Sequence, residues 1–152
     1  MPRLDPSDEP RLIGATQVAT LRRARAELEA KIGGTPNSFV IDGLGDVAGF
    51  ALETAGGAPF SLIAHSGDDS AWTILAHTVA ELPAIMAELG LEERGLSWRA
   101  KADPPKPWSV IRVDSQGART IVQRAAQQSA ARRACEYWTA RDAKQSWLVE
   151  KV

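Results

Sequence analysis

The chain has 152 residues and nearly balanced charges, with 18 Lys and Arg against 19 Asp and Glu. This length suits one ordinary domain or two small ones, and the mixed composition with five tryptophans indicates a folded protein and excludes bulk disorder. No apolar run is long enough to cross a bilayer, and the single cysteine, Cys135, excludes an internal disulfide. We therefore expect a cytoplasmic protein with no membrane partner.

The first predicted helix follows a proline-rich beginning. Residues 1–15 are expected to form a flexible lead-in, and residues 16–32 a helix that ends at Gly33 and Gly34. Its apolar residues Val18, Leu21, Leu28 and Ile32 fall on one stripe with partial heptad spacing. The stripe would pack on the chain's own sheet or, alternatively, form a homodimer through the helix 16–32.

Short apolar segments separated by glycine and aspartate follow this helix. Gly permits positive φ angles and Asp stabilises turns, so these separators predict tight connections. Four antiparallel strands are therefore expected in succession, over residues 37–41, 47–53, 60–65 and 72–77. A helix over about 78–89 comes next, with Thr78 and Glu81 as a capping box and Gly90 after its end, and Pro83 is expected to delay its regular start.

A proline-rich stretch over residues 99–107 is the predicted linker. Beyond it, strands over 108–113 and 119–123, a helix over about 127–140 and a strand over 147–150 form a ββαβ pattern. This order, with its alanine-rich helix, resembles small accessory modules of phage and plasmid proteins.

The fold class expected from these elements is α+β. An antiparallel β meander with packed helices would occupy residues 16–98, which are acidic, and a ββαβ module would occupy residues 108–152, which are basic. The proline-rich stretch could separate two domains, but a ββαβ unit of this length has little core of its own, so we favour one composite domain in which the helix over 16–32 or the helix over 78–89 covers the sheets.

Charge is distributed unevenly along the chain. From Ile32 to Glu93 there are nine acidic residues and no Lys or Arg, whereas from Arg94 onward twelve basic residues face five acidic ones. Such a one-signed region would repel like-charged partners and attract a basic protein. We therefore expect a small non-enzymatic inhibitor, of the anti-CRISPR or immunity-protein type, without a cofactor. The expected partner-binding residues are Asp42, Asp46, Asp68, Asp69 and the adjacent Trp72.

Nucleic-acid binding by the basic module is the alternative function. Arginines neutralise phosphates, so the contacts in that case would come from Arg119, Arg124, Arg132, Arg133 and Arg141. Against this function, the arginines are spread over strands and several sides of a helix.

A metal-dependent hydrolase is the third hypothesis, based on His65, Asp68, Asp69 and His77. Imidazole and carboxylate groups are suitable zinc ligands, but their spacing matches no known metal motif, and a turn with a capping box explains most of them. We therefore assign no catalytic or metal-binding residue.

Overall fold

The computed structural model describes residues 2–41, 45–65 and 68–152. The chain forms two compact units whose residues alternate along the sequence. The first unit comprises Met1–Ser7 and Ala15–Asp103, and the second comprises Asp8–Gly14 and Pro104–Val152. The later division falls within residues 99–107, the predicted linker. Among the described residues, no helix is both long and apolar enough to span a membrane.

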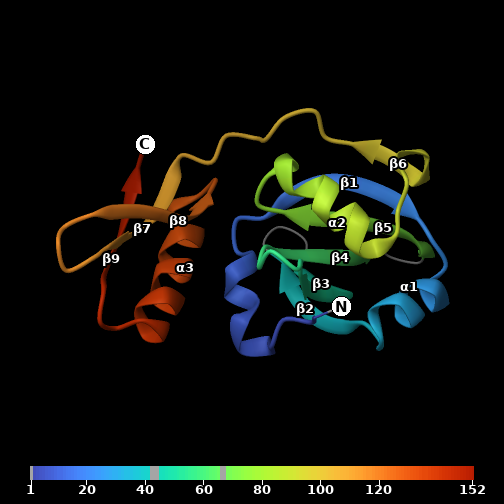
Figure 1. Cartoon of the computed structure of the whole chain (residues 1–152), viewed down its shortest axis with the longest axis horizontal. Coiled ribbons are helices and arrows are strands. Elements are labelled where there is room, and N and C mark those ends of the chain that lie inside the picture. The colour runs from blue at the N-terminus through green and yellow to red at the C-terminus, as the bar shows by residue number, and fades with distance from the viewer. Residues whose placement is uncertain (1, 42–44, 66–67) are drawn as a thin grey trace. The chain divides into compact units, whose positions relative to one another are not determined.

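The first unit is built on a six-stranded antiparallel sheet (Figure 1). The strand order is β2-β3-β4-β5-β1-β6, so the predicted four-strand meander is present and is extended by β1 beside β5 and by β6 beside β1. The strands are β1 (Thr16–Arg22), β2 (Asn37–Ile41), β3 (Gly45–Glu53), β4 (Pro59–His65), β5 (Asp68–Ala76) and β6 (Leu96–Arg99). The predicted α+β class is therefore confirmed.

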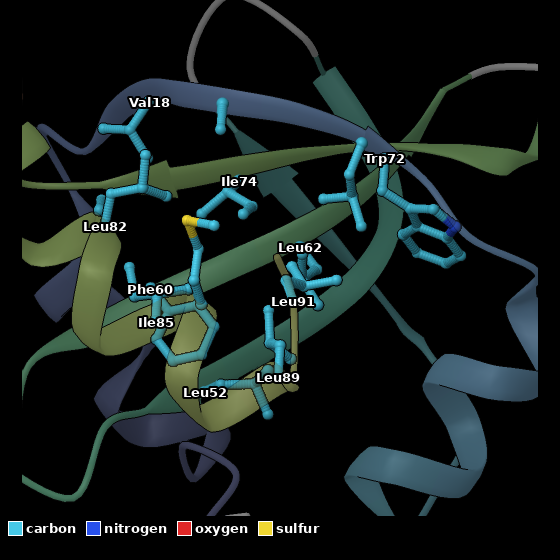
Figure 2. Close-up of a cluster of buried hydrophobic side chains, with 14 of the residues drawn as sticks. Val18, Leu52, Phe60, Leu62, Trp72, Ile74, Leu82, Ile85, Leu89 and Leu91 are labelled. Atoms are coloured by element: carbon cyan, nitrogen blue, oxygen red, sulfur yellow. The ribbon is translucent and has the colours of Figure 1, made fainter. Parts of the chain in front are cut away.

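The core of this unit lies between the sheet and the helix α2 (Leu82–Leu89). Figure 2 shows Leu82, Ile85 and Leu89 of this helix facing apolar side chains of β4 and β5. Alternate residues of a strand point to one face, which explains why Phe60 and Leu62 both reach this core. The helix α1 (Arg25–Ile32) contributes Leu28 and Ile32 to the same core.

The prediction of a helix over residues 16–32 is wrong for the first half of this range. Residues 16–22 form β1, which pairs with β5 and β6, and only Arg25–Ile32 is helical. Irregularities in the register of β1 interrupt its alternation, so that Val18, Ala19 and Leu21 are all buried. These apolar residues belong to the chain's own core, and the structure leaves no helical seam over 16–32 for a homodimer.

Two predicted features mark the start of the helix after the meander, the Thr78 cap and the delay of the regular helix at Pro83. Thr78 accepts a hydrogen bond from the Ala80 backbone N–H and precedes a 3-10 turn, η2 (Val79–Glu81). The regular helix α2 starts at Leu82 with Pro83 in its first turn, where a missing N–H costs nothing. Gly90 ends it in a left-handed conformation with a φ of 65°.

The second unit is a three-stranded antiparallel sheet with a helix on one face. Its strand order is β8-β7-β9, and its core joins Val110 and Ala125 to the small residues Ala130, Ala131 and Ala134 of the helix. Small side chains let the helix approach the strands closely. The elements are β7 (Trp108–Val113), β8 (Arg119–Ala125), α3 (Gln128–Arg141) and β9 (Ser146–Lys151), in the predicted ββαβ order.

The predicted flexible lead-in contains ordered structure. Residues Pro6–Leu12 form a 3-10 helix, η1, and the carbonyl oxygens of Pro10 and Ile13 accept hydrogen bonds from the Gln123 side chain at 3.0 and 2.6 Å. Asp8 accepts a 2.6 Å hydrogen bond from the Tyr137 hydroxyl and pairs with Arg141 at 2.8 Å. Residues 8–14 are therefore an integral part of the second unit.

Tyr137 gives this packing a spectroscopic signal, because it is the only tyrosine of the chain. Burial, and then the hydrogen bond to Asp8, raise the pKa of Tyr137 from its ordinary 10.0 to about 12. Since the neutral phenol is favoured in the folded protein, its contribution to stability is full below pH 10 and is lost as the pH rises to about 12.

We expect tyrosinate absorbance in the native protein to appear half-maximally near pH 12. Replacing Asp8 by alanine should lower the pKa of Tyr137 only in part, because burial is the larger cause. Near-ultraviolet circular dichroism at each pH verifies that the protein is still folded. Titration of the folded wild-type protein at pH 10 would contradict the Asp8–Tyr137 contact.

Candidate functional site

The acidic stretch forms ion pairs with arginines that lie outside it in the sequence. Asp68 pairs with Arg22 at 3.4 Å. The carboxylates of Glu92 and Glu93 pair with Arg94 and Arg99, each at 2.6 Å. All these arginines belong to the first unit, so the charge asymmetry seen in the sequence is reduced within that unit.

The four aspartates expected to bind a partner have different surroundings. Asp68 accepts hydrogen bonds from the Ser70 N–H and hydroxyl at 2.8 and 2.7 Å, and these bonds hold the pKa of Asp68 below its ordinary value. Asp69 is exposed beside it at the start of β5. Asp42 and the side chain of Asp46 lie outside what the structure describes.

Asp46 on β3 is separated from Asp68 and Asp69 on β5 by one strand, β4. The pairing of β3 with β4 begins at Gly49, so the first four residues of β3 pair with β2 alone. The neighbouring Val47 packs on Ile63 and Leu75, a cluster separate from the one beneath α2. The register runs from Gly49 through Ile63 to Thr73, so the start of β3 and the start of β5 lie toward the same end of the sheet, with β4 between them.

The prediction that Trp72 is a contact residue is wrong. Its side chain is fully buried, packs against Phe50 at a ring-centroid distance of 5.9 Å and donates a 3.0 Å hydrogen bond to the Arg23 carbonyl oxygen. A large apolar residue next to a turn looks available in the sequence, but the alternation of β5 directs this one into the core. Trp72 is a structural residue.

The five arginines expected to bind nucleic acid are divided between the two sides of the second unit. Arg119 and Arg124 are paired in register with Val113 and Ser109, which alternate with the core residue Val110 and so face away from α3. The remaining three, Arg132, Arg133 and Arg141, lie on α3. Arg119 forms an ion pair with Glu150, and Arg141 forms one with Asp8.

The histidines of the predicted metal site are far apart along the sheet. His65 is paired in register with Asp68 at the start of β5, whereas His77 follows its last residue, Ala76. Along β4, His65 is five residues, or about 17 Å, from Phe60, which pairs with the Ala76 that precedes His77. The described residues contain no group of three or more metal-ligating side chains, and the side chain of His65 is outside them.

A groove between α3 and β9 is a feature that our sequence analysis missed. It has a volume of about 440 Å³, and its lining is mostly apolar. Its walls are Val149 of β9 and one stripe of the helix, comprising Arg132, Cys135, Glu136, Thr139 and Ala140. Their spacing of three or four residues places all five helical residues on one side of α3, next to the face that carries the core alanines.

The strand beside this groove is an edge of its sheet. The order β8-β7-β9 leaves one side of β9 without a neighbouring strand. Val152 donates its N–H to the Pro107 carbonyl, and antiparallel pairing alternates, so the residues Trp147, Val149 and Lys151 direct their backbone groups away from β7. Within the described ranges, no hydrogen bond engages these outward groups.

The opposite edge of the same sheet is covered. The backbone of Gly14 approaches the Arg124 carbonyl so closely that a Cβ at this position would clash with it. Gln123, also on β8, donates hydrogen bonds to the carbonyl oxygens of Pro10 and Ile13. Residues 8–14 thus protect β8, whereas β9 has no such cover in the described part of the unit.

The groove combines an apolar depression with a row of unused backbone donors and acceptors. This combination suits the binding of a polypeptide, because a polypeptide supplies both side chains and backbone groups. The sequence does contain a signal for the groove. It is a second stripe on α3, beside the stripe of core alanines, that consists of small, polar and charged residues. Comparisons of the chain with protein-family models, curated proteins and solved structures found no match.

Proposed function

We propose that this chain is a small non-enzymatic protein-binding protein that binds its partner through the groove between α3 and β9. The observation that carries the proposal is the apolar groove beside an unpaired edge strand. A groove that binds a polypeptide does not require catalytic residues. The inhibitor role expected from the sequence, of the anti-CRISPR or immunity type, and a cytoplasmic location are part of this proposal.

The groove replaces the acidic stretch as the proposed contact surface. Trp72 is buried and Asp68 is engaged by Arg22 and Ser70, so two of the five expected contact residues have structural partners. Asp69 remains exposed and would steer a basic partner at long range. Charge then acts on association rate, and the groove supplies the short-range contacts.

Thr139→Arg tests the proposal directly. An arginine at this exposed helical position would place a long charged side chain in an apolar groove, while its high helix propensity preserves α3. We expect affinity for the partner to fall by on the order of tenfold or more. The partner would be captured from the native host after nuclease treatment, and its affinity would then be measured with purified components.

Ser129→Arg is the matched control, since Ser129 is exposed on the same helix and does not line the groove. We expect it to bind the partner like the wild-type protein. Equal binding by both variants would refute the groove as the contact surface. If the chain instead captures nucleic acid and binds it tightly, and the double variant Arg132→Glu with Arg133→Glu abolishes this binding, the nucleic-acid alternative is favoured.

A further inference from the structure

We infer that the groove binds an extended segment of another protein as a fourth strand of the sheet, with a large apolar side chain inserted opposite Val149. This inference rests on the proposed function and specifies the conformation and chemistry of the bound segment. The sheet order would become β8-β7-β9 followed by the partner strand.

The backbone of β9 has hydrogen-bonding groups that point away from the sheet. Trp147, Val149 and Lys151 each direct one N–H and one C=O away from β7, whereas the intervening Leu148 and Glu150 direct theirs toward it. Unpaired edge groups of this kind are the template for strand addition. An added strand would satisfy all six outward groups without any movement of β9.

The side chains define which residue of the partner is recognised. Val149 faces α3, because it packs with Val110 and the helix in the core of the second unit. In a paired strand the residue opposite Val149 points to the same face and therefore enters the groove between β9 and α3. Its neighbours would point to the other face of the sheet, next to Leu148, whose side chain is exposed.

The size of the groove selects the occupant. Two copies of this chain that paired through β9 with the outward groups matched would be centred on Val149, so each groove would receive the partner copy's valine at that position. A valine side chain is short and would contact little of the groove lining. An aromatic or long aliphatic side chain suits this volume better, and it would pack on Cys135, Ala140 and Val149.

Amide hydrogen exchange by NMR tests the strand pairing residue by residue. The probe is a synthetic peptide recovered from a random peptide library by binding to the wild-type protein and not to Thr139→Arg. On binding, we expect the amides of Trp147, Val149 and Lys151 to exchange more slowly by about tenfold or more. The amides of Leu148 and Glu150, which already face β7, should change little and serve as internal controls.

N-methylation of the peptide, one residue at a time, should weaken binding with a period of two, because alternate N–H groups face β9. Replacing its large apolar residue by alanine should weaken binding by on the order of tenfold.

A groove-dependent peptide that leaves the three amides unprotected would overturn strand pairing and leave the proposed function intact. A library that yields no groove-dependent peptide would overturn the inference. The proposed function would still be decided by the affinity of the partner captured from the native host. Concentration-dependent protection of the same amides without peptide would overturn the inference in favour of a second copy of the chain.

Discussion

Replacing Trp72 by alanine is expected to cost roughly 3–5 kcal/mol of the free energy of unfolding, as for other large buried aromatic residues. The indole is fully buried, contacts Phe50 and gives its N–H to the Arg23 carbonyl. The variant would leave a cavity in the core and an unsatisfied carbonyl near its edge. Urea unfolding monitored by circular dichroism measures the loss.

Trp98→Ala is the control for this prediction, because Trp98 is the same residue type in the same unit and is 47% exposed on β6. Its substitution should change the stability by about 0.5 kcal/mol or less. Similar losses in the two variants would contradict the distinction between a core and a surface tryptophan. A large loss for Trp72→Ala alone would support a structural role for Trp72.

The second large effect is expected from Gly14→Ala. Gly14 has a φ of 91°, and a Cβ added there would overlap the carbonyl oxygen of Arg124. The substitution would therefore combine a strained backbone conformation with a clash against the β8 backbone, which cannot rotate away. We expect a loss of about 2–5 kcal/mol, made up of about 1–2 for the left-handed conformation and about 1–3 for the overlap.

Gly117→Ala separates the two causes. Gly117 has a similar φ of 82° in the same unit, but no atom lies within 4 Å of a Cβ added there. This variant should lose only the conformational part, about 1–2 kcal/mol. Equal losses would show that residues 8–14 do not press against β8. Amide exchange of β8 in both variants reports directly on the second unit.

The strand pattern of the chain was largely predictable because its turns use residues with clear conformational roles. The strands 37–41 and 108–113 agree with their predicted bounds, and Gly90 ends α2 as expected. β1 was not predictable from periodicity, since register irregularities bury the adjacent residues Val18 and Ala19. β6 has only four residues and pairs with a strand about 75 residues earlier, a contact that local sequence does not encode.

The candidate site was less predictable than the fold. Whether a helical stripe such as Cys135, Thr139 and Ala140 is covered depends on where the neighbouring strand stops, and this depends on the strand order of the whole sheet. The surroundings of Asp68 were not predictable for a related reason. Arg22 precedes the acidic stretch in the chain, and pairing of β1 with β5 places it against Asp68.

The alternation of the two units along the chain has a consequence for synthesis on the ribosome. Asp8 is made 129 residues before its partner Tyr137, and Pro10 is made 113 residues before Gln123. At about 5–20 residues per second, residues 8–14 would wait on the order of ten seconds for the strands and helix on which they pack. A nascent chain therefore cannot complete the second unit until both segments have been made. A fragment that starts at Pro104 cannot complete it, because this fragment lacks residues 8–14.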